Sequence, residues 1–96
     1  MEDNERSDLE FELQISGLNL VAAKINAPDG VIKLKMNYSV EEYEIFMSEL
    51  EKIPSGVCSG GIAWLTNGWL EYTYHDEFDY SGWDMHIPTP IPSDLL

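Results

Sequence analysis

The sequence predicts an α+β fold in which an antiparallel sheet of five to six strands, curled or sandwich-like, packs against one helix. Three observations lead to this prediction. Residues 9–15 and 31–38 alternate apolar and polar side chains, which is typical of half-buried strands. Residues 39–53 change to the spacing of an amphipathic helix. Asn67-Gly68 is a dipeptide that strongly favours a two-residue hairpin turn. The expected order is β-β-β-α-β-β-β.

The first third of the chain is expected to supply three strands. Residues 1–8 are polar and charged, and are expected to be disordered. The first strand is predicted over residues 9–15, where one face carries Leu9, Phe11, Leu13 and Ile15. Residues 18–25 are more apolar and predict a strand inside the sheet. A turn over 27–30, Ala-Pro-Asp-Gly, leads into a third strand over 31–38.

One helix follows the third strand. Ser39 and Glu42 have the spacing of a capping box, in which each side chain accepts from the other residue's backbone N–H. The apolar stripe of this helix consists of Tyr43, Phe46, Met47 and Leu50. Pro54 predicts that the helix ends at about Ile53.

The second half of the chain predicts a hairpin and a last strand. A two-residue loop at Asn67-Gly68 pairs Leu65 with Leu70 and Trp64 with Glu71. One sheet face then carries apolar core residues, and the other carries Ile62, Trp64, Thr66, Trp69, Glu71 and Thr73. A turn is expected at 79–82, before a final alternating stretch over 83–87. Residues 88–96 are expected to form an extended, proline-rich tail of a single domain, 1–96.

The chain is strongly acidic, with 18 carboxylates, five lysines and arginines, and a net charge of −13. Such a field disfavours nucleic acid and anionic membranes as partners, and favours a basic protein. All five basic residues lie within the first 52 positions. The acidic groups of the later part therefore lack counter-charges in their own segment, although Lys33 and Lys35 remain able to pair with them across the sheet.

The compartment is expected to be the cytoplasm. The single cysteine, Cys58, cannot form an internal disulfide, and is expected to be a partly buried small residue in a reducing environment. The acidic N-terminus lacks the apolar core of a signal peptide, and no apolar run reaches the length of a membrane helix.

Catalysis, metals and cofactors are not expected. His75-Asp76 and Asp84-x-His86 contain ligand types, but their spacing matches no established metal motif. Glu71 and Asp84 are candidates for acid–base chemistry, yet the chain lacks a phosphate loop, a nucleophile elbow or an HExxH helix. A domain of one helix and one sheet at this size rarely encloses a catalytic cleft.

The predicted functional surface is a partner-binding surface that combines acidic and aromatic residues. Its candidate residues are Trp69, Glu71, Asp76, Glu77, Asp79, Tyr80, Trp83 and Asp84. If the helix covers the opposite face, Trp64 and Trp69 lie on an open sheet surface beside Glu71, as in binding hot spots. If the early strands cover that face as a second sheet, both tryptophans belong to the core. Sequence leaves both arrangements open.

Residues 67–92 resemble the small acidic immunity proteins of bacterial polymorphic-toxin and contact-dependent growth-inhibition systems. The resembling features are Asn67-Gly68, the segment 79–83, and the prolines of 88–92. The resemblance implies a non-enzymatic monomer that binds the basic, nuclease-like C-terminal domain of its cognate toxin in a 1:1 complex. The alternative is a DNA mimic of a phage or mobile element, which would present regularly spaced carboxylates along an edge.

Overall fold

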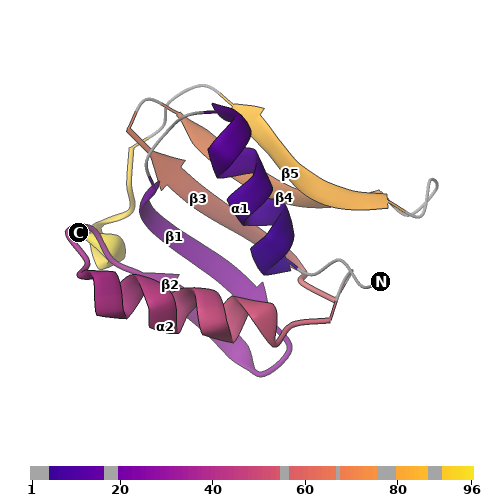
Figure 1. Cartoon of the computed structure of the whole chain (residues 1–96), viewed down its shortest axis with the longest axis horizontal. Helices are drawn as coiled ribbons and strands as arrows, with labels where there is room; N and C mark the ends of the chain where they lie inside the picture. The colour runs from indigo at the N-terminus through magenta and orange to yellow at the C-terminus, as the bar shows by residue number, and fades with distance from the viewer. Residues whose placement is uncertain (1–4, 17–19, 55–56, 67, 76–79, 87–89) are drawn as a thin grey trace.

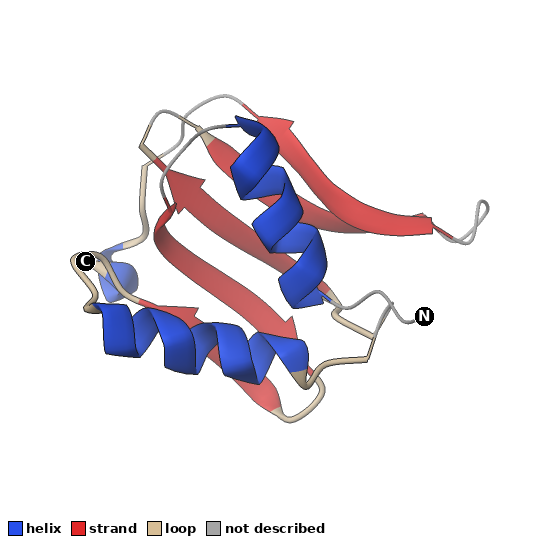
Figure 2. Ribbon diagram, viewed as in Figure 1, coloured by secondary structure: helices blue, strands red, loops and turns tan. Residues whose placement is uncertain are grey.

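A five-stranded antiparallel sheet with both helices on one face forms the protein (Figure 1). The computed structural model describes residues 5–16, 20–54, 57–66, 68–75, 80–86 and 90–96. The elements are α1 (Glu5–Ser16), β1 (Leu20–Ala27), β2 (Gly30–Leu34), α2 (Val40–Glu51), β3 (Gly60–Leu65), β4 (Trp69–His75), β5 (Tyr80–His86) and the 3₁₀ turn η2 (Ser93–Leu95). The strand order is β2-β1-β3-β4-β5, with α2 packed on β2 and α1 on β5 (Figure 2). The predicted α+β class and antiparallel sheet are confirmed, but the predicted element order is wrong.

The error in the order comes from residues 9–15, which belong to α1 and not to a strand. Leu9 and Leu13 satisfy a period of two, but they are also four residues apart and share a helix face. Leu9 is fully buried and Leu13 packs on the main core, whereas Phe11 between them is 58% exposed. Residues 5–14 contain no β-branched residue and are rich in good helix formers. Helix propensity therefore decides the structure of this segment.

The start of α1 is held by Arg6, so the expected disorder of residues 1–8 does not extend to residues 5–8. The Arg6 guanidinium lies 3.4 Å from the carboxylate of Glu10 on the same helix. It also lies 3.0 Å from Glu51 and 3.7 Å from Glu44, both on α2. One cation thus ties the first turns of α1 to the neighbouring helix.

The β1–β2 hairpin follows the prediction, except that β2 is shorter than expected. Pro28 and Asp29 form the turn, and Gly30 adopts a φ of 140°, which favours glycine. β1 is an interior strand, as its apolar composition predicted. β2 ends at Leu34, and Asn37 has a φ of 63°, so the chain turns before the predicted strand end at residue 38.

α2 forms where its sequence predicts. Ser39 Oγ accepts from the Glu42 N–H at 3.1 Å, and the Glu42 carboxylate accepts from the Ser39 N–H at 2.9 Å. Both halves of the predicted capping box are therefore present. The predicted apolar stripe faces the sheet, with Phe46, Met47 and Leu50 buried. The helix ends at Glu51, two residues before the predicted boundary.

The later strands keep their predicted faces but change their register. Trp64 pairs with Trp69 and Ala63 with Leu70, a shift of two residues from the expected pairing. Because the shift is even, each side chain stays on its predicted face. The second predicted turn, 79–82, is wrong, because Tyr80 already pairs with His75 and residues 80–82 belong to β5.

The main core lies between the sheet and the two helices. It contains Leu9, Ala23, Ile25, Leu34, Phe46, Met47, Leu50, Ala63, Leu70, Tyr72 and Trp83, among others. Cys58 is buried at its margin, 2% exposed, with its sulfur 3.2 Å from the Gly60 carbonyl oxygen. Among the described residues, no helix reaches the length and apolarity that crossing a membrane needs.

Candidate binding surface on the sheet

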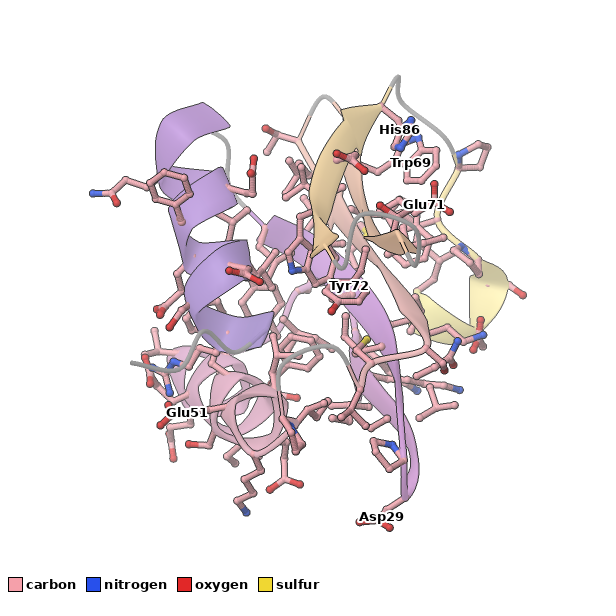
Figure 3. The ribbon with its side chains drawn as sticks, turned by 90° about the vertical axis from the view of Figure 1, so that its right-hand side faces the viewer. Asp29, Glu51, Trp69, Glu71, Tyr72 and His86 are labelled. Carbon is pink, nitrogen blue, oxygen red and sulfur yellow. The ribbon has the colours of Figure 1, made fainter. Side chains whose placement is uncertain are left out.

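The second face of the sheet, opposite the helices, carries the polar side chains of the later strands. Side chains alternate along each strand, so Leu70 and Tyr72 enter the main core while Trp69, Glu71 and Thr73 point the other way. In Figure 3 the helices lie on one side of the sheet, and the labelled Trp69, Glu71 and His86 lie on the other. No second sheet covers this face within the described part of the chain.

The end of the chain covers part of this second face. Leu95 in η2 is fully buried against Trp64 and Ala22, and forms a small second core with them. The Leu95 carbonyl accepts from the Met36 N–H at 2.8 Å. Residues 90–96 are therefore docked on the sheet, and residues 93–95 form a 3₁₀ turn where the sequence predicted an extended tail. As a result Trp64 is only 4% exposed.

Lys33 holds this docked segment by an ion pair. Its Nζ lies 3.0 Å from Asp94 Oδ2. The hydrogen bond and charge of Lys33 lower the pKa of the Asp94 carboxyl below its usual value of 3.8. Asp94, an acid of the C-terminal half, is thus paired with Lys33, one of the two lysines that the sequence left able to neutralise it.

Beyond the docked segment lies an open cluster that we call the β4–β5 patch: Trp69, Glu71 and Thr73 of β4 with Asp84 and His86 of β5. The His86 imidazole stacks on the half-buried Trp69 indole, with ring centroids 4.4 Å apart and an interplanar angle of 23°. His86 Nε2 lies 3.3 Å from Glu71 Oε1. Thr73 Oγ1 donates to Asp84 Oδ2 at 2.7 Å. These contacts link His86 to Trp69 and Glu71, and Thr73 to Asp84.

Among the described residues, the carboxylates of the patch contact a histidine but no lysine or arginine. Glu71 and Asp84 are direct partners in the β4–β5 register. Within the described part of the chain, neither forms an ion pair with a lysine or arginine. By contrast, Glu10, Glu44 and Glu51 of the helices surround Arg6. The patch therefore places adjacent negative charges on a solvent-accessible sheet surface.

A hollow of about 350 Å³ borders the patch. Lys24 on β1, Ile62 on β3 and Glu71 on β4 line it. Gly60, the first residue of β3, has no side chain to fill this part of the hollow. Its φ of 151° favours glycine at this position. The hollow provides space for a partner side chain next to the Glu71 carboxylate.

Three of the eight candidate residues lie on this surface: Trp69, Glu71 and Asp84. Trp83 instead lies in the main core, 3% exposed, with its ring edge against Tyr72, so its indole is not available to a partner. Asp76, Glu77 and Asp79 lie outside the described residues, and so does the side chain of Tyr80. His86 and Thr73 were not selected, although alternation places His86 on the same strand face as Asp84.

The patch combines two carboxylates with a hydroxyl and two rings. Within the described residues, no three His, Cys, Asp or Glu side chains gather closely enough to hold a metal ion. The patch is an open surface, and the chemistry it offers is attraction of cationic groups with a flat ring surface beside them.

Comparisons with protein-family models, curated proteins and solved structures find no match to this chain.

Proposed function

We propose that this protein is an immunity protein that neutralises a basic toxin domain, of the nuclease class, by docking the β4–β5 patch over its substrate cleft. The observation that carries the proposal is the opposition of Glu71 and Asp84 on an open sheet face without a lysine or arginine partner among the described residues. Cations that neutralise this pair are then supplied by the other molecule.

Electrostatics supports a nuclease as the target. An enzyme that binds nucleic acid needs a cleft lined by lysine and arginine, because phosphate contacts dominate its affinity. A protein with a net charge of −13 is attracted to such a cleft, and its association is accelerated. Once docked, the patch excludes the substrate by occupying the positions of the phosphates.

The ring surface supports tight binding after encounter. Trp69 and His86 form a flat surface held by stacking, so little side-chain freedom is lost when a partner packs on it. The hollow next to Glu71 has room for an arginine or lysine side chain. Most of the binding energy of an interface comes from a few such anchors.

The arrangement of the carboxylates favours this proposal over a DNA mimic. A mimic needs acids spaced like phosphates along an edge. In the patch the two acids instead lie opposite each other on neighbouring strands, next to aromatic rings. This compact combination is suited to the side chains of a protein partner in the cytoplasm.

Co-expression tests the proposal directly. The protein encoded by the adjacent gene, which the proposal predicts to contain a basic toxin domain, is expressed in bacteria with and without this protein. We expect growth to be restored and a 1:1 complex to elute from size-exclusion chromatography. Continued toxicity without a complex would contradict the proposal. If the partner in the complex is a DNA-binding protein that is not toxic, this result would instead favour the DNA mimic.

A further inference from the structure

A second surface with binding features lies at the opposite edge of the sheet, along β2. Two hollows, of about 600 Å³ and 330 Å³, lie between β2 and α2 and share Ile32 and Glu49 in their walls. We call these two adjoining hollows the β2-edge groove. Among the large apolar side chains that the structure describes as exposed, Val31, Ile45 and Val57 all line it. Their exposures are 50%, 64% and 45%.

The backbone of β2 offers hydrogen-bonding groups along this groove. β2 is an edge strand with only β1 beside it. The two-residue turn makes Ala27 and Gly30 a hydrogen-bonded pair, and such pairs then alternate along the ladder. Val31 and Lys33 consequently direct their N–H and C=O groups away from β1. Among the described residues, the N–H and C=O groups of Val31 and Lys33 have no backbone hydrogen-bond partner. By contrast, the N–H of Met36, just beyond them, donates to the Leu95 carbonyl.

We propose that the β2-edge groove binds an extended segment of a partner protein, which adds to the sheet as a sixth strand beside β2. Strand addition uses main-chain hydrogen bonds for affinity and alternate side chains for specificity. The proposal concerns the edge opposite the β4–β5 patch and does not depend on the proposed function.

The charges beside β2 define the chemistry of the added strand. On the helix side, Glu42 and Glu49 of α2 flank the apolar Ile45; Lys52 already pairs with Glu49 at 2.8 Å, whereas Glu42 has no cationic partner among the described residues. On the other side, Lys33 and Lys35 follow the alternation of the strand. The complementary segment therefore carries valine-like and basic residues on the face toward α2, and a polar or acidic residue on the other face.

The same charges argue against a second copy of the chain as the occupant. Antiparallel pairing of two β2 edges would bring the lysines of one copy against those of the other, and like charges at opposed positions are destabilising. Two copies would also each bring a net charge of −13. Edge lysines are a common device against such self-pairing.

A synthetic peptide provides the test. The probe is the capped heptapeptide Arg-Thr-Val-Glu-Val-Thr-Arg, titrated into the ¹⁵N-labelled full chain. Its sequence reads the same in both directions, so parallel and antiparallel addition present the same faces. We expect saturable binding, with larger amide shifts at Val31 and Lys33 than at Ile32 and Leu34. No binding, or shifts centred away from β2, would overturn the proposal.

Two N-methylated versions of the peptide separate strand addition from general attraction to an acidic protein. One version is methylated at the odd positions and the other at the even positions. Successive N–H groups of a strand point to opposite sides, so only one of the two versions loses the N–H donors that face β2. We expect one version to bind at least about tenfold more weakly and the other to bind within about threefold of the parent, as the loss of several backbone hydrogen bonds predicts. Equal affinities of the two versions would contradict strand addition.

A matched pair of protein variants tests the location. Ile45→Arg and Phe11→Arg each replace one exposed apolar residue on a helix by a cation, but only Ile45 lines the groove. We expect Ile45→Arg to weaken the peptide at least about tenfold, because it repels the arginines and removes an apolar contact. Phe11→Arg should leave the affinity within about twofold. Equal weakening by both substitutions would show that net charge alone controls the interaction.

Discussion

Glu71 and Asp84 lie directly opposite each other on β4 and β5, so two carboxylates share one cross-strand position on the open face of the sheet. Like charges at such positions destabilise a sheet. His86 beside Glu71 and the hydroxyl of Thr73 beside Asp84 lower this cost but add no lysine or arginine. A sheet with this like-charged pair is less stable than one without it. Such a loss of stability is typical of positions selected for binding.

Removing one charge of the pair should therefore stabilise the isolated protein. Asp84→Asn keeps an oxygen that can accept from Thr73 and leaves the Glu71–His86 contact in place. We expect the free energy of unfolding to rise by about 0.2–1 kcal/mol at low salt. Urea denaturation measures this, with Asp29→Asn in the exposed β1–β2 turn as the control. In 1 M NaCl the gain in stability should disappear, because the repulsion between charges is then screened beyond about 3 Å. A loss of stability at low salt would show that the pair is not repulsive.

Leu95 should contribute far more to stability than its position near the chain end suggests. It is fully buried against Trp64, whereas the adjacent Leu96 is 67% exposed. Leu95→Ala should lower the free energy of unfolding by about 2–5 kcal/mol, the cost of removing a buried leucine. Leu96→Ala is the matched control and should change it by less than about 0.5 kcal/mol. Similar small effects of both substitutions would contradict the docking of residues 90–96.

The Lys33–Asp94 ion pair predicts a pH dependence of stability. Lys33 lowers the pKa of Asp94 in the folded protein, so the carboxylate stabilises the fold above the unfolded pKa of 3.8. This contribution is lost as the pH falls through the lower, folded pKa. The difference in unfolding free energy between wild type and Asp94→Asn should therefore be constant at neutral pH and shrink under strongly acidic conditions.

A double-mutant cycle assigns that dependence to the pair. In the Lys33→Gln background, Asp94→Asn should change the pH profile much less, because the main group that lowers the pKa of Asp94 is gone. If the profile of Asp94→Asn is the same in both backgrounds, the interaction is not with Lys33.

The capping box of α2 should be measurable in stability. Ser39→Ala removes the acceptor of the Glu42 N–H and should lower the free energy of unfolding by about 1 kcal/mol. Ser48→Ala, on the exposed side of the same helix, is the control. It should be neutral or slightly stabilising, since alanine is the better helix former. Thermal unfolding followed by circular dichroism distinguishes the two variants.

Local signals predicted the elements that depend on local chemistry. The capping box and apolar stripe of α2 and the Pro28-Asp29 turn were recognisable because each involves residues close in sequence. The face of each later strand was also predictable, since alternation survives a register shift of two residues. These faces were enough to place Trp69 and Glu71 on one surface.

The remaining features depend on contacts between distant residues. Leu9 and Leu13 fit a strand and a helix equally, and α1 is decided by propensity and by the contacts of Arg6 with α2. Nothing near Leu95 in sequence indicates that it fills a site beside Trp64. Alternation put Trp83 on the face opposite Asp84, but only the position of the helices shows that this face is the main core.

The central claim is that the β4–β5 patch meets the cations of a basic toxin domain, and association kinetics tests it most directly. Two variants with the same change in net charge are compared: Glu71→Gln/Asp84→Asn in the patch, and Asp29→Asn/Glu41→Gln outside it. At low salt we expect the patch variant to associate at least about tenfold more slowly than wild type, and the control variant within about threefold. Equal association rates for the two variants would place the interface elsewhere and contradict the account.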